Sequence, residues 1–170
     1  MSHELDPAAR GADGGDAPLQ SGVVVAVCVG PGGIPKQPVP SARVLALGLE
    51  GDAHRFRLHG GANRAVCVFS VEDYAALQRD GVDVEPPGAF GENLTTEGLD
   101  NTQLRPGMRL RVGAEVVLEI FDVREPCGTL KSIDRRFPNL MVGRSGWMCR
   151  VLTEGVVTVG DTITALRARP

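Results

Sequence analysis

Cys127 has the clearest capacity for chemistry, because of the segments on either side of it. Residues 119–124 alternate like a strand, and residues 129–136 are typical of one or two helical turns. Pro126 suits the first helical position, since it has no N–H to leave unpaired. We therefore expect the thiol to face free backbone N–H groups and the positive end of a helix dipole, with Arg124 nearby. Both would favour the thiolate, which is a nucleophile and a metal ligand. The alternative is a small buried side chain that only packs.

The other three cysteines lie in apolar surroundings. Cys28 lies within residues 23–29 and Cys67 within residues 65–69, and both runs are typical of buried strands. Burial among apolar neighbours raises the pKa of a thiol and makes it inert. Cys149 is expected in the core as well. No C-x-x-C pair occurs, so a four-cysteine zinc site is not expected. With no secretory signal, a reducing cytoplasm is the expected location.

Residues 48–64 form a second concentration of reactive side chains. The candidate ligand residues in it are Asp52, His54, Arg55, Arg57, His59 and Arg64. Its glycines let the backbone approach a ligand closely, and cationic side chains beside open amides make an anion site. The alternative is a solvated loop. A zinc site would need Asp52 or Cys127 as a third ligand, and no helix presents the two histidines at a four-residue spacing.

Two shorter segments add candidate ligands. In residues 88–94, Asn93 could bind a polar ligand or close an Asx-turn, and for the residue alone the turn is favoured. The apolar side chains expected to anchor this segment are Phe90 and Leu94. Arg144 follows later in the chain, and its guanidinium could grip a phosphate with two hydrogen bonds.

Length and charge exclude several classes of protein. The 170 residues are enough for one domain with a proper core. Residues 1–20 contain four acidic residues and one arginine, which accounts for the whole net charge of −3. The remainder is neutral, which argues against a nucleic-acid partner, and no apolar run is long enough to span a membrane. We expect residues 1–20 to be a disordered acidic tail and residues 21–170 to be the domain.

Short apolar runs separated by 22 glycines and 12 prolines are typical of a β-rich barrel or sandwich. Strands are expected at 22–29, 42–47, 64–69, 108–112, 115–123, 147–152 and 161–166. The best helix covers 71–79, with Ser70 as its cap, Asp73 at its third position, and one face formed by Val71, Tyr74, Ala75 and Gln78. Residues 30–40 are expected to be an exposed loop.

Several of these segments together resemble one family. In chain order they are Gly-Leu-Glu-Gly-Asp (48–52), His-Gly-Gly (59–61), Ser-Val-Glu-Asp-Tyr (70–74), Gly-Ala-Phe-Gly-Glu-Asn-Leu (88–94), Glu-Pro-Cys (125–127) and Gly-Trp-x-x-Arg-Val (146–151). The set is similar to a stand-alone MOSC domain, named for the C-terminal domain of molybdenum cofactor sulfurases. The resemblance implies a mainly β fold, a closed antiparallel β-barrel like that of pyruvate kinase, with a few short helices. It also implies that Cys127 is the functional cysteine.

The resemblance further implies the molybdenum cofactor, a molybdopterin, as partner. Its phosphate could be held by Arg55, Arg64 and Arg144. No aminotransferase-like domain with a pyridoxal phosphate lysine is seen, so a complete sulfurase is not expected.

Two functions stay open. One is a small reductase of N-hydroxylated compounds with Cys127 as molybdenum ligand and an external electron donor. The other is a sulfur carrier or cofactor-binding module with a persulfide on Cys127, loaded by a sulfur donor protein. A third interpretation is a thiol-bearing barrel that binds another anion.

Overall fold

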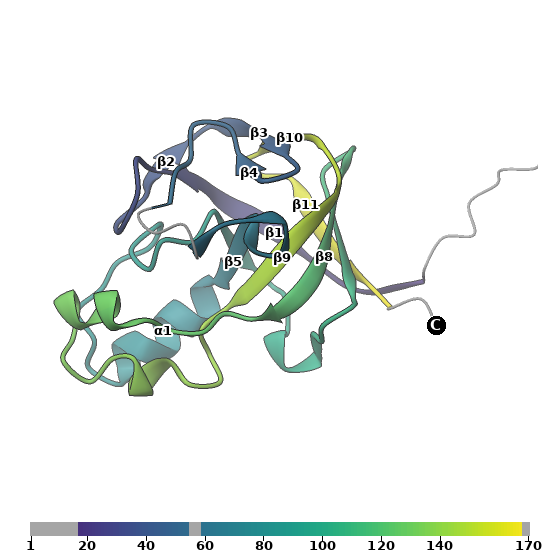
Figure 1. Ribbon diagram of the computed structural model, residues 1–170. Helices are drawn as coiled ribbons and strands as arrows, with labels where there is room; N and C mark the ends of the chain where they lie inside the picture. The colour runs from purple at the N-terminus through teal and green to yellow at the C-terminus, as the bar shows by residue number, and fades with distance from the viewer. Residues whose placement is uncertain (1–16, 55–58, 168–170) are drawn as a thin grey trace, which may run out of the picture.

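The computed structural model describes residues 17–54 and 59–167, and its framework is a closed β-barrel (Figure 1). The strands are β1 (Pro18–Val29), β2 (Gln37–Val39), β3 (Ser41–Leu45), β4 (Gly48–Leu49), β5 (Val66–Ser70), β6 (Leu94–Glu97), β7 (Arg109–Val112), β8 (Val116–Val123), β9 (Trp147–Thr153), β10 (Gly155–Thr158) and β11 (Thr162–Leu166). The helices are α1 (Val71–Arg79) and the 3-10 helices η2 (Ala62–Arg64), η3 (Asn101–Gln103), η4 (Gly128–Ser132) and η5 (Asn139–Met141).

Pairing of the first and last strands closes the barrel. The main sheet runs β11-β7-β8-β9-β5-β6-β1-β2, and β11 also pairs with β1, which leaves β2 outside the ring. The pairings are antiparallel except for β5 with β6, which is parallel. A parallel pair needs a crossover connection, and α1 provides it. The expected closed, mainly antiparallel barrel is therefore confirmed.

Each expected strand has a counterpart, but four short strands lie outside the expected ranges: β2, β4, β6 and β10. The expectation that residues 30–40 are an exposed loop is wrong in its second half. Residues Gln37–Val39 pair with β1, and the Lys36 side chain beside them is buried. The run is too short and too rich in proline to show a strand period, and only the neighbouring strand makes it one.

Helix α1 begins and ends where the sequence predicts. Ser70 is its cap, and the Ser70 hydroxyl accepts a hydrogen bond from the Asp73 N–H at 3.1 Å. Its buried residues are Tyr74 and Leu77, so the expected face was only partly right. Gln78 lies at the surface, where its amide donates to the Val84 carbonyl.

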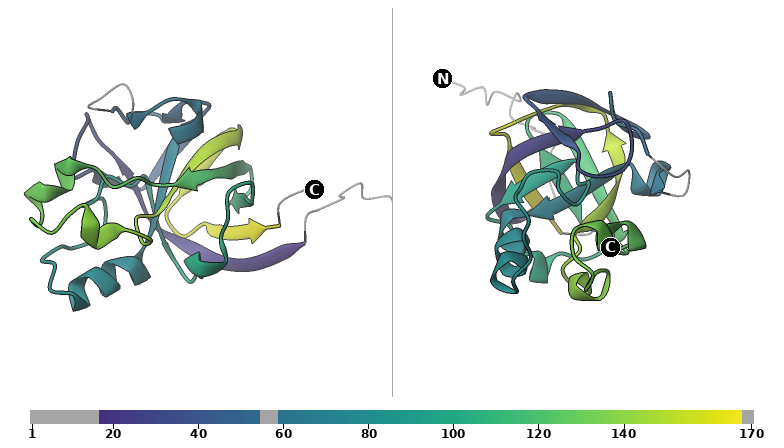
Figure 2. Two further views of the ribbon diagram at one scale, coloured as in Figure 1. Left: turned by 60° about the horizontal axis from the view of Figure 1, so that its bottom comes forward. Right: turned by 90° about the vertical axis from the view of Figure 1, so that its left-hand side faces the viewer.

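A second hydrophobic cluster lies outside the barrel core. Four of its rings, Phe69, Tyr74, Phe90 and Phe137, pack with centroids 5.0–5.7 Å apart. Figures 1 and 2 show α1 and the segment that contains η4 and η5 gathered at the same end of the barrel. The cluster thus fixes two stretches that carry candidate ligands, residues 88–94 and the chain after β8, against the barrel.

The first strand begins earlier than the expected domain boundary. Strand β1 starts at Pro18, which pairs with Leu166 of β11, and the Gln20 side chain exchanges two hydrogen bonds with the Asp100 backbone. The expectation of a disordered tail falls, for residues 1–16, outside the described part of the chain. No helix in that described part is long and apolar enough to cross a membrane.

Candidate functional site

One pocket collects most of the candidate residues at the barrel end that faces η4. It lies between the loop after β1, the loop after β4, residues 90–93, and the chain after β8. It is lined by Gly33, Ile34, Lys36, Ala53, His54, His59, Arg64, Cys67, Phe90, Gly91, Asn93, Arg124, Glu125, Cys127, Thr129, Leu130 and Met148. The barrel therefore brings Cys127 together with His54, His59, Arg64 and Asn93, which are far apart in the sequence.

Cys127 is the residue that precedes η4, and its side chain is half-buried in this pocket. Burial raises the pKa of the thiol, but hydrogen bonds from the Thr129 hydroxyl and backbone N–H outweigh it. The Arg124 charge and the Leu130 N–H add to the effect, and the pKa lies below its ordinary value. The helix is 3-10 and begins at Gly128, so Pro126 does not occupy its first position as expected. The thiolate is favoured by local hydrogen bonds and a cation.

The other three cysteines are buried, as expected. Burial raises the pKa of Cys28 to about 12, and it also raises the pKa of Cys67 and of Cys149. Cys67 lines the same pocket as Cys127, but it belongs to β5 and its thiol is buried. All four thiols are free. Only Cys127 is not buried and has a lowered pKa, and these are properties of a nucleophile or a metal ligand.

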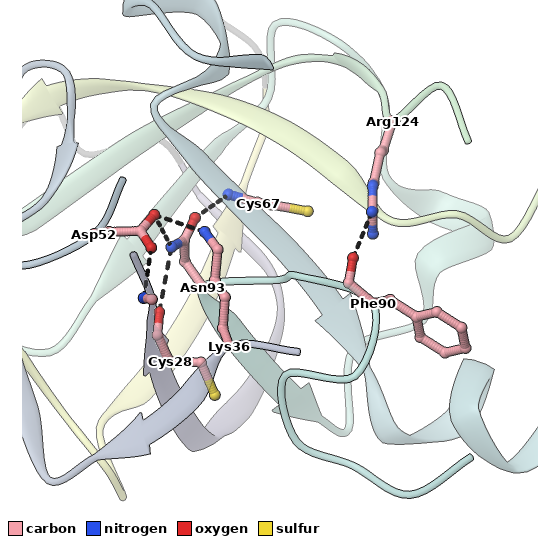
Figure 3. Close-up of polar contacts among 8 residues, drawn as sticks. Cys28, Lys36, Asp52, Cys67, Phe90, Asn93 and Arg124 are labelled. Carbon is pink, nitrogen blue, oxygen red and sulfur yellow. Dashed lines mark hydrogen bonds and ion pairs between the residues drawn. The ribbon is translucent and has the colours of Figure 1, made fainter. Parts of the chain in front are cut away.

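Asp52 anchors the pocket wall and does not face a ligand. Its carboxylate accepts a hydrogen bond from the Lys36 ammonium at 2.6 Å and another from the Gly30 N–H at 2.9 Å. The Asn93 amide donates to it at 2.8 Å (Figure 3). The carboxylate is only 1% exposed, so its charge is balanced within the protein by Lys36. The sequence singled out Asp52 but gave no signal for its partner Lys36, which lies in the loop that was expected to be exposed.

Asn93 joins three separate segments through its side chain. Its Oδ1 accepts from the Cys67 N–H at 3.0 Å, while its Nδ2 donates to the Cys28 carbonyl at 3.2 Å and to Asp52 (Figure 3). These contacts replace the Asx-turn that the sequence favoured. The residue is 1% exposed and lines the pocket, but its amide is already occupied, so it sets the shape of the pocket wall.

Two arginines that line the pocket carry side-chain donors with no hydrogen-bond partner among the described residues. Within the described chain, Arg64 Nε and Arg124 Nη1 are buried and have no hydrogen-bond partner. Arg124 is held in place at both ends: its N–H donates to the Gly146 carbonyl at 2.9 Å, and its Nη2 donates to the Phe90 carbonyl (Figure 3). An unpaired buried donor costs about 1–3 kcal/mol, and more when it is charged. An anion in contact with these two nitrogens would satisfy both groups.

Sequence reasoning recognised Arg124 only as a neighbour of Cys127 and missed it as a pocket donor. The signal was its place at the end of a strand that leads directly into the cysteine. Arg64 was anticipated, and η2 places it at the pocket.

The two histidines are less basic than usual. Burial lowers the pKa of His54, and the charge of Lys36 lowers it further. Burial also lowers the pKa of His59, together with the charges of Arg64 and Arg124. Gly60 leaves room for the His54 ring, because a Cβ at position 60 would lie 2.9 Å from His54 Nδ1.

In the described residues, no three His, Cys, Asp or Glu side chains are grouped to hold a metal ion by themselves.

One expected ligand, Arg144, does not line the pocket. Arg55 lies outside the described residues. The Arg144 guanidinium forms an ion pair with Asp80, and its Nε donates to the Leu140 carbonyl at 2.9 Å. These contacts of Arg144 join the C-terminal end of α1 to η5. Arg144 is not among the residues that line the pocket, so it does not bind a ligand there.

A shallow groove continues from the pocket past Cys127. It is lined by Pro31, Gly32, Gly33, Ile34, Gly128, Thr129 and Ser132, and it shares Gly33, Ile34 and Thr129 with the pocket. The described residues that line the groove carry no charged side chain, in contrast to the arginines and lysine that line the pocket. A ligand with one anionic end and one neutral end would match the two regions.

Comparisons with known proteins agree on one family for this chain. The model of the MOSC domain family matches residues 55–164. A protein from Gibberella moniliformis named "Reductase" is 34% identical over 131 residues, which cover 71% of this chain and 23% of that protein. Protein YiiM of Escherichia coli is 33% identical over 122 residues, 66% of this chain and 53% of the relative. The chain thus spans about a quarter to a half of the length of these relatives.

Solved structures agree with the fold. The crystal structure of YiiM from Geobacillus stearothermophilus matches with a TM-score of 0.71 at 26% identity, covering 86% of this chain and 75% of that one. The structure of YiiM from Escherichia coli matches with a TM-score of 0.70 at 28% identity, covering 89% and 72%.

Proposed function

The chain belongs to the MOSC domain family, which is associated with the molybdenum cofactor, and from that premise we propose a small reductase of N-hydroxylated compounds. In this proposal the pocket binds the molybdenum cofactor, and Cys127 is the protein ligand to the metal. The proposed activity takes support from the relative named "Reductase", to which this chain corresponds only in part.

The observation that carries the proposal is the pairing of a favoured thiolate with unsatisfied cationic donors in one pocket. A soft thiolate suits a transition metal. The phosphate of the pterin would accept hydrogen bonds from Arg64 Nε and Arg124 Nη1, which are buried and lack a partner within the described residues. The residues present therefore fit this cofactor, and Arg124 takes the place expected for Arg144.

The cofactor, when bound, supplies the two-electron chemistry of the metal. Cleavage of the N–O bond of a hydroxylamine to an amine and water consumes two electrons and two protons. An external electron donor protein provides the electrons. Cys127, Arg64 and Arg124 would hold the cofactor, and the buried network of Asp52, Lys36 and Asn93 would support the pocket wall.

A sulfur carrier is the second candidate, and the accessibility of Cys127 favours it. The thiol is half-exposed, and the uncharged groove beside it would admit a donor protein's sulfur-bearing cysteine. A persulfide on Cys127 would form by transfer of that sulfur to the thiolate, with the donor's cysteine as the leaving thiol. We place either activity in the cytoplasm, since all four cysteines are free and suit a reducing compartment.

The test is to express the chain with molybdate and measure bound molybdenum and pterin phosphate per chain. Arg64→Gln and Arg124→Gln should each weaken cofactor retention by roughly tenfold or more, because each removes a charge-assisted bond of about 1.5–3 kcal/mol. Arg144→Gln is the matched control, since its ion pair lies outside the pocket. It should leave retention unchanged.

Cys127→Ser tests both candidates, and the group bound to wild-type Cys127 separates them. For the reductase it should abolish reduction of a hydroxylamine while some pterin is still retained. Sulfane sulfur on wild-type Cys127 without molybdenum would instead support the carrier. Full activity in Cys127→Ser would contradict both.

A further inference from the structure

The pocket contains two titratable imidazoles among fixed positive charges. His54 is influenced by Lys36, Asp52, His59 and Arg64, and His59 by Arg64 and Arg124. The acidic groups in reach are Asp52, which is committed to Lys36, and Glu125, which is exposed at the pocket edge. The Cys127 thiol lines the same pocket.

We propose that a dianion entering this pocket binds together with protons that His54 and His59 take up. This inference rests on the proposed function only in using the same anion pocket. It adds that the ligand carries a doubly charged group, such as a phosphate monoester, and that the two histidines are part of its binding site.

The physical reason is that a bound dianion opposes the positive charges that surround the two histidine rings. Without a ligand, burial lowers the pKa of both rings, and the charges of Lys36, Arg64 and Arg124 lower it further. Two negative charges placed beside Arg64 and Arg124 oppose those cations and favour imidazolium. The bound form then holds more protons than the free form, so affinity must fall as pH rises between the free and the bound pKa. Each unit by which a histidine pKa rises on binding is worth about tenfold in affinity.

The coupling has a use in the proposed reaction. Reduction of an N–O bond consumes two protons, which have to be delivered within the pocket. Two histidines that become protonated when the pocket is loaded would keep those protons near Cys127.

Sulfate is the probe that tests this, because it stays doubly charged from pH 5 to 9 and does not itself titrate. Isothermal titration calorimetry of the full chain with sulfate, in buffers of different ionisation enthalpy, counts the protons taken up. We expect net uptake near pH 6.5 and a sulfate affinity that falls about tenfold or more between pH 5.5 and 8. Sulfate binding without proton uptake would overturn the inference and leave the cofactor proposal standing.

Histidine variants and NMR identify the residues that take up the protons. His54→Gln and His59→Gln should each reduce the uptake, and the double variant should abolish it. Uptake that persists in the double variant would overturn the assignment. Because the chain has three histidines, ring C–H signals of the wild type can be followed directly, with His3→Gln to identify the remaining one. Two signals should titrate at higher pH when sulfate is present, and unchanged midpoints would refute the proposal even if a variant fails to fold.

No sulfate binding at any pH would overturn the inference and the anion pocket together. The role of Cys127 would then be judged from the molybdenum and persulfide measurements alone.

Discussion

Asn93 offers the sharpest test of how the pocket wall is built. The change Asn93→Ala removes two neutral hydrogen bonds, to the Cys67 N–H and the Cys28 carbonyl, and one charge-assisted bond to Asp52. Neutral bonds contribute about 0.5–1.5 kcal/mol each and a bond to a charged group about 1.5–3 kcal/mol. Because the groups left behind are buried, we expect the free energy of unfolding to fall by about 3–5 kcal/mol.

The measurement is urea denaturation of the purified chain, followed by fluorescence of the single tryptophan. Asn139→Ala is the matched control, because that asparagine is exposed in η5 and should change stability by less than about 0.5 kcal/mol. A loss below about 1 kcal/mol for Asn93→Ala would refute the view that this amide joins β1, β5 and the loop after β4.

Three further results are expected. Alkylation at neutral pH with peptide mapping should label Cys127 well before the three buried cysteines, and faster labelling of any of those would contradict the assignment. Deletion of residues 1–16 should leave the melting temperature within a few degrees, whereas deletion of 1–20 should lower it clearly, because Gln20 and its strand pairing are lost. Stability should be full above the ordinary histidine pKa and decline as pH falls through it, because both pocket histidines have lowered values in the folded chain. Urea midpoints at pH 7.5 and 5.5 would check this. In the variant that lacks both histidines, we expect the midpoint to be the same at the two pH values.

The local features of the chain were readable from the sequence. Helix α1 was predicted with its cap, because Ser70 and Asp73 satisfy each other within four residues. Strands β7 and β8 were predicted at 108–112 and 115–123, since a short apolar run between turn residues is a local feature. The contrast between Cys127 and the strand cysteines was also visible, because a run of apolar neighbours predicts burial.

The residues that complete the pocket could not be read from the sequence. Lys36 seemed to lie in an exposed loop, and only the pairing of β2 with β1 buries it beside Asp52. Arg144 has the composition of a phosphate ligand, but Asp80, at the end of α1, binds it. Arg124 has its free donor in the pocket because the Phe90 carbonyl and the Gly146 carbonyl hold it there.

The sequence by itself determined the secondary structure that neighbours in the chain can enforce, and which thiol is set apart from the core. The tertiary structure alone decided which charges remain available. Closure of the barrel brings Lys36 to the Asp52 carboxylate and neutralises it. Within the described residues it brings no hydrogen-bond partner to Arg64 Nε or Arg124 Nη1. Those partners lie up to dozens of residues away, so no local pattern encodes them.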